Sequence, residues 1–93
     1  MTAKYEAAMV FSVANGDDAV TALKEKFNDL IAMNGTIEDV NDWGKRRLAY
    51  LINDEAEGYY VFTTFTADAN FPAELERVAR ITDGVLRIMV IKK

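Results

Sequence analysis

The sequence predicts an α+β domain in which two helices cover one face of a four-stranded antiparallel sheet. Four short stretches show the alternating apolar pattern of strands, and two longer ones show apolar residues at helical spacing. Their order is strand, helix, strand, strand, helix, strand. Two right-handed crossovers around a central hairpin give this order the ferredoxin-like βαββαβ fold, with the first and third strands in the middle. At 93 residues the chain has room for one core, so residues 1–93 are predicted to form a single domain.

The first strand is predicted over residues 5–11, and both of its faces are largely apolar, as in a central strand. The turn at residues 15–18 supplies carboxylates for the start of a helix. Lys24 falls outside the apolar stripe of this helix and is expected to be solvated. We expect Asn34-Gly35 to end the helix, with Gly35 in the left-handed conformation.

The second strand is predicted to run from Thr36 to Ile52 with irregularities along its length. The spacing of three between Ile37 and Val40 breaks strict alternation and predicts a bulge near residues 39–41. Gly44 marks a second irregularity. Because bulges favour edges, we expect this strand at the border of the sheet.

The remaining elements follow from stronger patterns. The polar residues 53–58 predict a hairpin loop, and residues 59–65 form the strongest strand pattern in the chain. Asn70 and Pro72 suit the start of a second helix, which a glycine ends. The last strand is predicted over residues 85–91.

The sheet face away from the helices is predicted to be apolar and to meet a partner or a ligand. The side chains expected on that face are Tyr59, Val61, Phe65, Met89 and Ile91. Of these, Tyr59, Val61, Met89 and Ile91 are the predicted contacts for a partner protein.

The composition argues against catalysis. The chain has no histidine and no cysteine, which removes the usual general base, thiolate chemistry and most transition-metal sites. Its paired carboxylates lie in predicted turns and edges, and its glycines form no phosphate-binding loop. We expect no enzyme activity, cofactor, metal site or membrane span, and a cytoplasmic location.

Three consecutive cations stand out in a chain of net charge −4, within Trp43-Gly44-Lys45-Arg46-Arg47-Leu48-Ala49-Tyr50. Adjacent cations repel one another and suit a surface that meets an anion. They also suit an edge strand that blocks sheet-to-sheet pairing, so charge alone leaves both interpretations open. The base-stacking motif of RNA-recognition domains is incomplete at residues 57–64, which keep only its glycine and first aromatic.

That eight-residue stretch, with Tyr5-Glu6, Gly58-Tyr59-Tyr60 and residues 85–92, resembles the family of the sixth protein of the bacterial small ribosomal subunit. The resemblance covers essentially the whole chain. It implies a ferredoxin-like fold and a structural role in the ribosome. It also implies binding to the central domain of small-subunit ribosomal RNA, as a heterodimer with the eighteenth small-subunit protein.

Together, the charge pattern and the resemblance predict which side chains meet RNA phosphates. These are Lys45, Arg46, Arg47, Arg87, Lys92 and Lys93. Arg87 suits either the phosphates or the partner protein. A different function on the same fold is an oligomeric regulatory module that binds a small molecule; a stable homodimer and a polar pocket would distinguish it.

Overall fold

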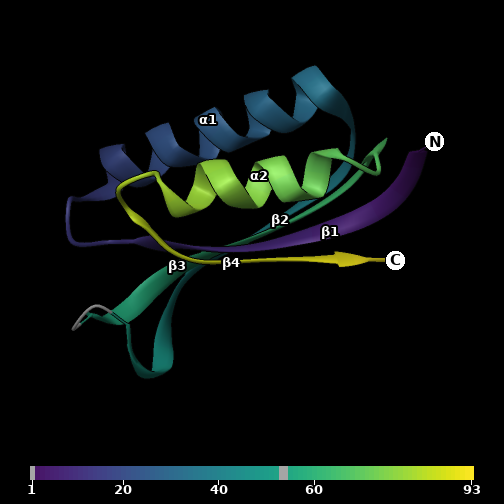
Figure 1. Cartoon of the computed structure of the whole chain (residues 1–93). Helices are drawn as coiled ribbons and strands as arrows, with labels where there is room; N and C mark the ends of the chain where they lie inside the picture. Colours follow the sequence, from purple (N-terminus) through teal and green to yellow (C-terminus); the bar gives the residue numbers. More distant parts are fainter. Residues whose placement is uncertain (1, 53–54) are drawn as a thin grey trace.

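The computed structural model describes residues 2–52 and 55–93 and has the predicted order of elements (Figure 1). The elements are β1 (Thr2–Ser12), α1 (Asp17–Asn34), β2 (Gly35–Ile52), β3 (Glu55–Asp68), α2 (Phe71–Arg80) and β4 (Val85–Lys92). The four strands form one sheet in the order β2-β3-β1-β4, and every pairing is antiparallel. Both helices lie on the same face of the sheet (Figure 1). The ferredoxin-like fold and the central places of β1 and β3 are therefore confirmed.

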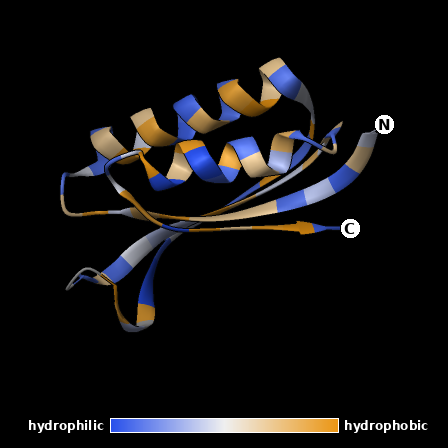
Figure 2. Cartoon of the chain, viewed as in Figure 1, coloured by the Kyte–Doolittle hydropathy of each residue, from blue (hydrophilic) through white to orange (hydrophobic). Residues whose placement is uncertain are grey.

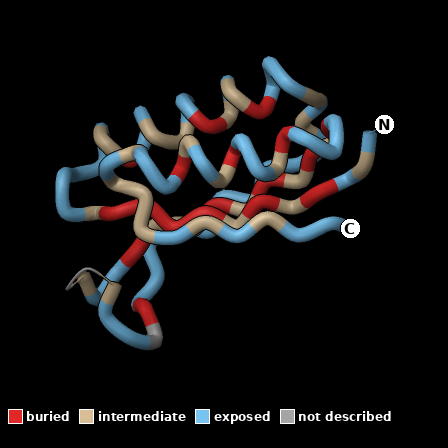
Figure 3. The backbone as a smooth tube through the Cα atoms, in the orientation of Figure 1, coloured by how far each residue is buried: buried red, intermediate tan, exposed pale blue. Residues whose placement is uncertain are grey.

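The core lies between the helices and the sheet, where the buried positions gather (Figure 3). Phe65 of β3 is fully buried, with its ring 5.7 Å from Tyr5 and 5.8 Å from Phe71 between centroids. Phe11 of β1 stacks on Phe27 of α1 at 6.0 Å. These rings join the two central strands to the two helices, and they supply much of the buried apolar area.

Gly35 does not end α1 in the left-handed conformation, so that prediction was wrong. Its φ of −172° is extended, and β2 begins at this residue. A β-carbon here would lie 2.2 Å from the carbonyl oxygen of Thr66 on β3. Glycine is needed because the two backbones approach closely, and not because of a positive φ.

The irregularities of β2 fall near their predicted places. The pairing with β3 shifts between Ile37 and Asp39, slightly before the predicted bulge, and again between Asp42 and Gly44, as predicted. Gly44 has a φ of 76°, a conformation that glycine adopts without strain. Since bulges bend and twist a strand, they help the end of the β2–β3 hairpin to leave the plane of the sheet on the side away from the helices (Figure 1).

The hairpin loop is shorter than predicted, because β3 begins at Glu55. The first two residues of the predicted loop, 53 and 54, lie outside the described residues. Gly58, expected to close the loop, lies inside the strand, opposite Ser12 of β1 and Arg46 of β2. A β-carbon on Gly58 would lie 2.4 Å from Cγ1 of Val10, so this glycine accommodates close side-chain packing.

The prediction assigned the wrong face of β3 to the open side of the sheet. Tyr59, Val61 and Phe65 face the helices, and Val61 and Phe65 are buried. Alternation could not choose between the faces because both carry aromatic residues. The register decides it, since β3 places these residues opposite the core-facing side chains of β1.

The predicted partner contacts therefore divide into two pairs. Tyr59 and Val61 lie on the helix-facing side, so their assignment to the open face is corrected. Met89 and Ile91 lie on the open face and are about half exposed. β4 is hydrophobic over most of its length, although it borders the sheet (Figure 2).

Candidate nucleic-acid interface

Three adjacent cations of β2, Lys45, Arg46 and Arg47, are all exposed, and we call them the hairpin cations. Lys45 lies on the helix side, where its Nζ is 3.7 Å from Oδ1 of Asp17. Arg46 lies on the other side and donates from Nη1 to the carbonyl of Lys45 at 3.3 Å. Within residues 2–52 and 55–93, Arg47 makes no hydrogen bond or ion pair. Neither arginine is neutralised by a described carboxylate, so both guanidinium groups can bind an anion.

The two C-terminal cations lie at the opposite end of the sheet. Lys92 of β4 pairs with Tyr5, near the start of β1. Arg46 of β2 pairs with Gly58 of β3, which in turn pairs with Ser12 at the other end of β1. Tyr5 and Ser12 are seven positions apart along β1, a length of roughly 23 Å at the rise of an extended chain. The Nζ of Lys93 is 3.6 Å from Oε2 of Glu6. The structure therefore forms two separate basic regions and does not gather the predicted cations into one.

A contact between α1 and β2 holds the bulge that precedes the hairpin cations. Lys24 donates to Oδ2 of Asp42 at 2.8 Å and to the hydroxyl of Tyr59 at 3.3 Å, and its Nζ lies 4.8 Å from the centre of the Tyr59 ring. The other oxygen of Asp42 accepts the N–H of Gly44 at 3.1 Å. Lys24 is therefore a structural residue and not the solvated side chain that the sequence predicts.

The protonation of this pair follows from its contacts. The hydrogen bond to Asp42 is the main cause that raises the pKa of Lys24 above 10.5, and partial burial opposes it. Partial burial acts to raise the pKa of Asp42, but hydrogen bonds from Lys24, Tyr59 and Gly44 together lower it below 3.8. Both groups are therefore charged at neutral pH.

Asp42→Asn is expected to lower the free energy of unfolding by about 1 kcal/mol at pH 7, since the lost ion pair is partly exposed. Folding lowers the pKa of the Asp42 carboxyl, so its charge stabilises the protein at any pH above 3.8, the ordinary pKa of the group. This contribution disappears as the pH falls through the lowered pKa of the folded state. The difference between wild type and variant should therefore shrink below pH 3.8 in urea unfolding curves. Asp39→Asn is the control, because Asp39 forms no ion pair with a described residue; an equal effect would contradict the prediction.

Aromatic side chains cover part of the open face next to the bulge. Trp43 is 52% exposed and meets Phe62 edge-on, with ring centroids 4.6 Å apart. Phe62 in turn lies 6.4 Å from Tyr60. These rings, with Met89 and Ile91, give the open face apolar parts of a kind that often meet a partner.

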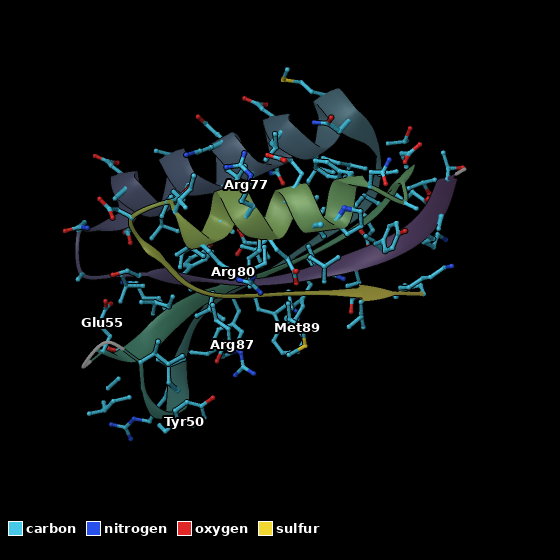
Figure 4. The ribbon with its side chains drawn as sticks, in the orientation of Figure 1. Tyr50, Glu55, Arg77, Arg80, Arg87 and Met89 are labelled. Atoms are coloured by element: carbon cyan, nitrogen blue, oxygen red, sulfur yellow. The ribbon has the colours of Figure 1, made fainter. Side chains whose placement is uncertain are left out.

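A groove separates β4 from the end of the hairpin, and its volume is about 280 Å³. Arg87 reaches across the hairpin side of the groove and donates from Nη1 to the hydroxyl of Tyr50 at 3.0 Å. Figure 4 shows Arg87 and Met89 on the same side of β4, with Tyr50 on the hairpin below them. The residues that line the groove are Ala8, Val10, Leu48, Tyr50, Ile52, Tyr60, Arg87 and Met89.

The sequence did not predict this groove. The alternation of Leu48, Tyr50 and Ile52 was a signal that one side of the hairpin faces apolar surroundings. The bend that turns those residues toward β4 depends on the tertiary pairing. Arg87 is the one predicted RNA contact that lines this groove within the described residues.

Other kinds of site find little support in the described part of the chain. Residues 2–52 and 55–93 contain no cluster of three or more carboxylate, histidine or cysteine side chains suited to a metal ion. Neither described helix has the length and apolar character needed to cross a membrane.

Comparison with known proteins gives consistent results. The family model described as ribosomal protein S6 matches residues 4–92. A protein of Clostridium perfringens named small ribosomal subunit protein bS6 is 46% identical over 91 residues, which covers 97% of this chain and 96% of the relative. A bS6 of Clostridium novyi is 46% identical over 88 residues, covering 94% and 93%. The crystal structure of 30S ribosomal protein S6 from Thermotoga maritima superposes with a TM-score of 0.93 at 25% identity, covering all of this chain and 89% of the other.

Proposed function

The chain belongs to the ribosomal protein S6 family, and from this premise we propose that it binds the central domain of small-subunit ribosomal RNA as a heterodimer with the eighteenth small-subunit protein. Family membership makes the chain a structural protein of the small ribosomal subunit, located in the cytoplasm, and not an enzyme. The RNA contacts and the partner are what we infer beyond that.

The observation that carries the RNA contact is the exposed group of hairpin cations. Arg46 and Arg47 lack a carboxylate partner among the described residues, and a guanidinium can bind two phosphate oxygens at once. Lys92 and Lys93 are proposed as a second phosphate contact at the other end of the sheet. Such contacts position a protein on RNA without reading its sequence, so specificity would come from RNA shape and the partner.

The apolar open face supports the protein partner. Of the predicted contacts, Met89 and Ile91 lie on the open face, on β4, with β1 between them and the aromatic group formed by Trp43, Tyr60 and Phe62. Covering these side chains would remove apolar area from water. A basic partner would also explain how a chain of net charge −4 approaches RNA.

The test is the salt dependence of RNA binding by the heterodimer, measured for the double variant Arg46→Met/Arg47→Met. RNA binding releases counterions in proportion to the phosphates that the protein neutralises, so a variant with fewer phosphate contacts releases fewer of them. We expect the magnitude of the slope of log K against log salt to fall by roughly 1.5–2, and the affinity at low salt to fall roughly tenfold or more. The matched control is Arg77→Met/Arg80→Met, which removes the same charge from α2, where both arginines pair with glutamates. An unchanged slope in the first variant, or the same change in the control, would contradict the phosphate contact.

A further inference from the structure

We propose that Asn15 is a site of spontaneous deamidation, a covalent modification that needs only water and that converts this side chain into a carboxylate. The chain contains two Asn-Gly pairs, Asn15-Gly16 and Asn34-Gly35, which lie in different surroundings. The first pair lies between β1 and α1, whereas the second pair joins α1 to β2. Neither the reaction nor its test depends on the proposed function.

The reaction requires the backbone nitrogen that follows the asparagine to reach the carbonyl carbon of its side chain. The nitrogen of Gly16 forms a bond to Cγ of Asn15, the bond from Cγ to Nδ2 breaks, and Nδ2 leaves as ammonia with the proton from the glycine nitrogen. Water then opens the cyclic imide, giving aspartate if it attacks Cγ and isoaspartate if it attacks the backbone carbonyl carbon. A glycine in the second place favours ring closure, because it has no β-carbon to hinder the approach.

The surroundings of Asn15 leave it able to react. Its side chain is exposed and forms no hydrogen bond with residues 2–52 or 55–93. Gly16 is exposed as well, and apart from its chain neighbours no described residue approaches its β-carbon position within 4 Å. The N–H of Gly16 donates to the carbonyl of Val13 at 3.2 Å, which is long for a backbone hydrogen bond. Since water can replace this bond at the surface, it opposes the attack only weakly.

Asn34 is protected, although it has the same neighbour in the sequence. It is the last residue of α1, and the five-membered imide ring requires backbone angles outside the helical region. Its Nδ2, the leaving group, donates to the carbonyl of Leu30 at 2.9 Å. The β-carbon position of Gly35 lies 2.2 Å from the carbonyl oxygen of Thr66, so the chain cannot turn here without separating β2 from β3. Attack at Asn34 therefore requires local opening of both elements, a state that is rarely populated.

The modification changes both the charge and the length of the connection between β1 and α1. Either product adds one negative charge just before Asp17 and Asp18, which begin α1. Isoaspartate also carries the main chain through Cγ, which adds one atom to the connection. The carboxylate of Asp17 lies 3.7 Å from Nζ of Lys45, so the altered segment adjoins one of the hairpin cations.

The test is incubation of the folded full chain in mildly alkaline buffer, followed by digestion with trypsin and tandem mass spectrometry. Cleavage after lysine places Asn15 in the peptide of residues 5–24 and Asn34 in that of residues 27–45, so the two sites are measured separately. Each deamidation replaces an NH₂ group by OH, a gain of about 1 Da. We expect Asn15 to react roughly tenfold or more faster than Asn34, because only Asn34 must first break its hydrogen bond and open the surrounding structure.

The matched control is the same chain unfolded in guanidinium chloride, where both Asn-Gly pairs are open to water and we expect them to react at similar rates. A second control is Asn15→Gln, which should remove the more acidic species that ion-exchange chromatography separates from the incubated folded protein. Equal rates at the two sites of the folded protein, or a faster reaction at Asn34, would overturn the proposal. It also fails if Asn15 of the folded protein stays intact over the time in which the unfolded chain reacts.

Discussion

Phe65→Ala is expected to lower the free energy of unfolding by about 3–5 kcal/mol, measured by urea denaturation. Phe65 is fully buried on the helix-facing side of β3, between Tyr5 of β1 and Phe71 of α2. Truncation removes its transfer free energy and leaves a cavity between elements that cannot close without moving the helix. For a domain stable by about 5–15 kcal/mol, this is a large fraction of the total.

The control for this prediction is Phe62→Ala, on the same strand with its side chain on the open face. Phe62 is only partly buried and packs against half-exposed Trp43, so we expect a loss of about 1–2 kcal/mol. The comparison tests the side of the sheet on which each residue lies. Equal losses, or a larger loss for Phe62→Ala, would contradict the observed orientation of β3.

Gly35→Ala is expected to destabilise the protein by about 3 kcal/mol, although its extended φ is one that alanine adopts freely. The new β-carbon would lie 2.2 Å from the carbonyl oxygen of Thr66 and 2.9 Å from the β-carbon of Ala67. Neither is the flexible end of a long side chain, so β2 must move away from β3 at the point where it leaves α1. Thermal and urea unfolding would measure the loss.

Gly16→Ala is the matched control for Gly35→Ala. Gly16 has a φ of 91°, but apart from its two chain neighbours no described residue has an atom within 4 Å of the β-carbon position. Only the backbone conformation is strained, which costs about 1–2 kcal/mol. If Gly16→Ala were the more harmful change, close backbone approach would not be the reason for Gly35.

Much of the candidate site could be predicted from local sequence. The hairpin cations, the bulge at Gly44 and the exposed edge positions of Met89 and Ile91 follow from charge, glycine placement and alternation. The contact of Lys24 with Asp42 could not, because it joins residues 18 positions apart on different elements. The bond from Arg87 to Tyr50 spans 37 positions, and it depends on how far the hairpin bends.

By itself, the sequence determined the order of the elements, the ferredoxin-like fold and the central places of β1 and β3. Periodicity is a property of neighbouring residues, and the handedness of the crossovers leaves few ways to arrange six such elements. Only the tertiary structure decided which face of β3 meets the helices. Both faces of residues 59–65 are rich in aromatics, and a strand's orientation changes with a shift of one residue in its pairing. The register with β1 selects the face of Val61 and Phe65 for the core, and leaves Tyr60 and Phe62 for the open face.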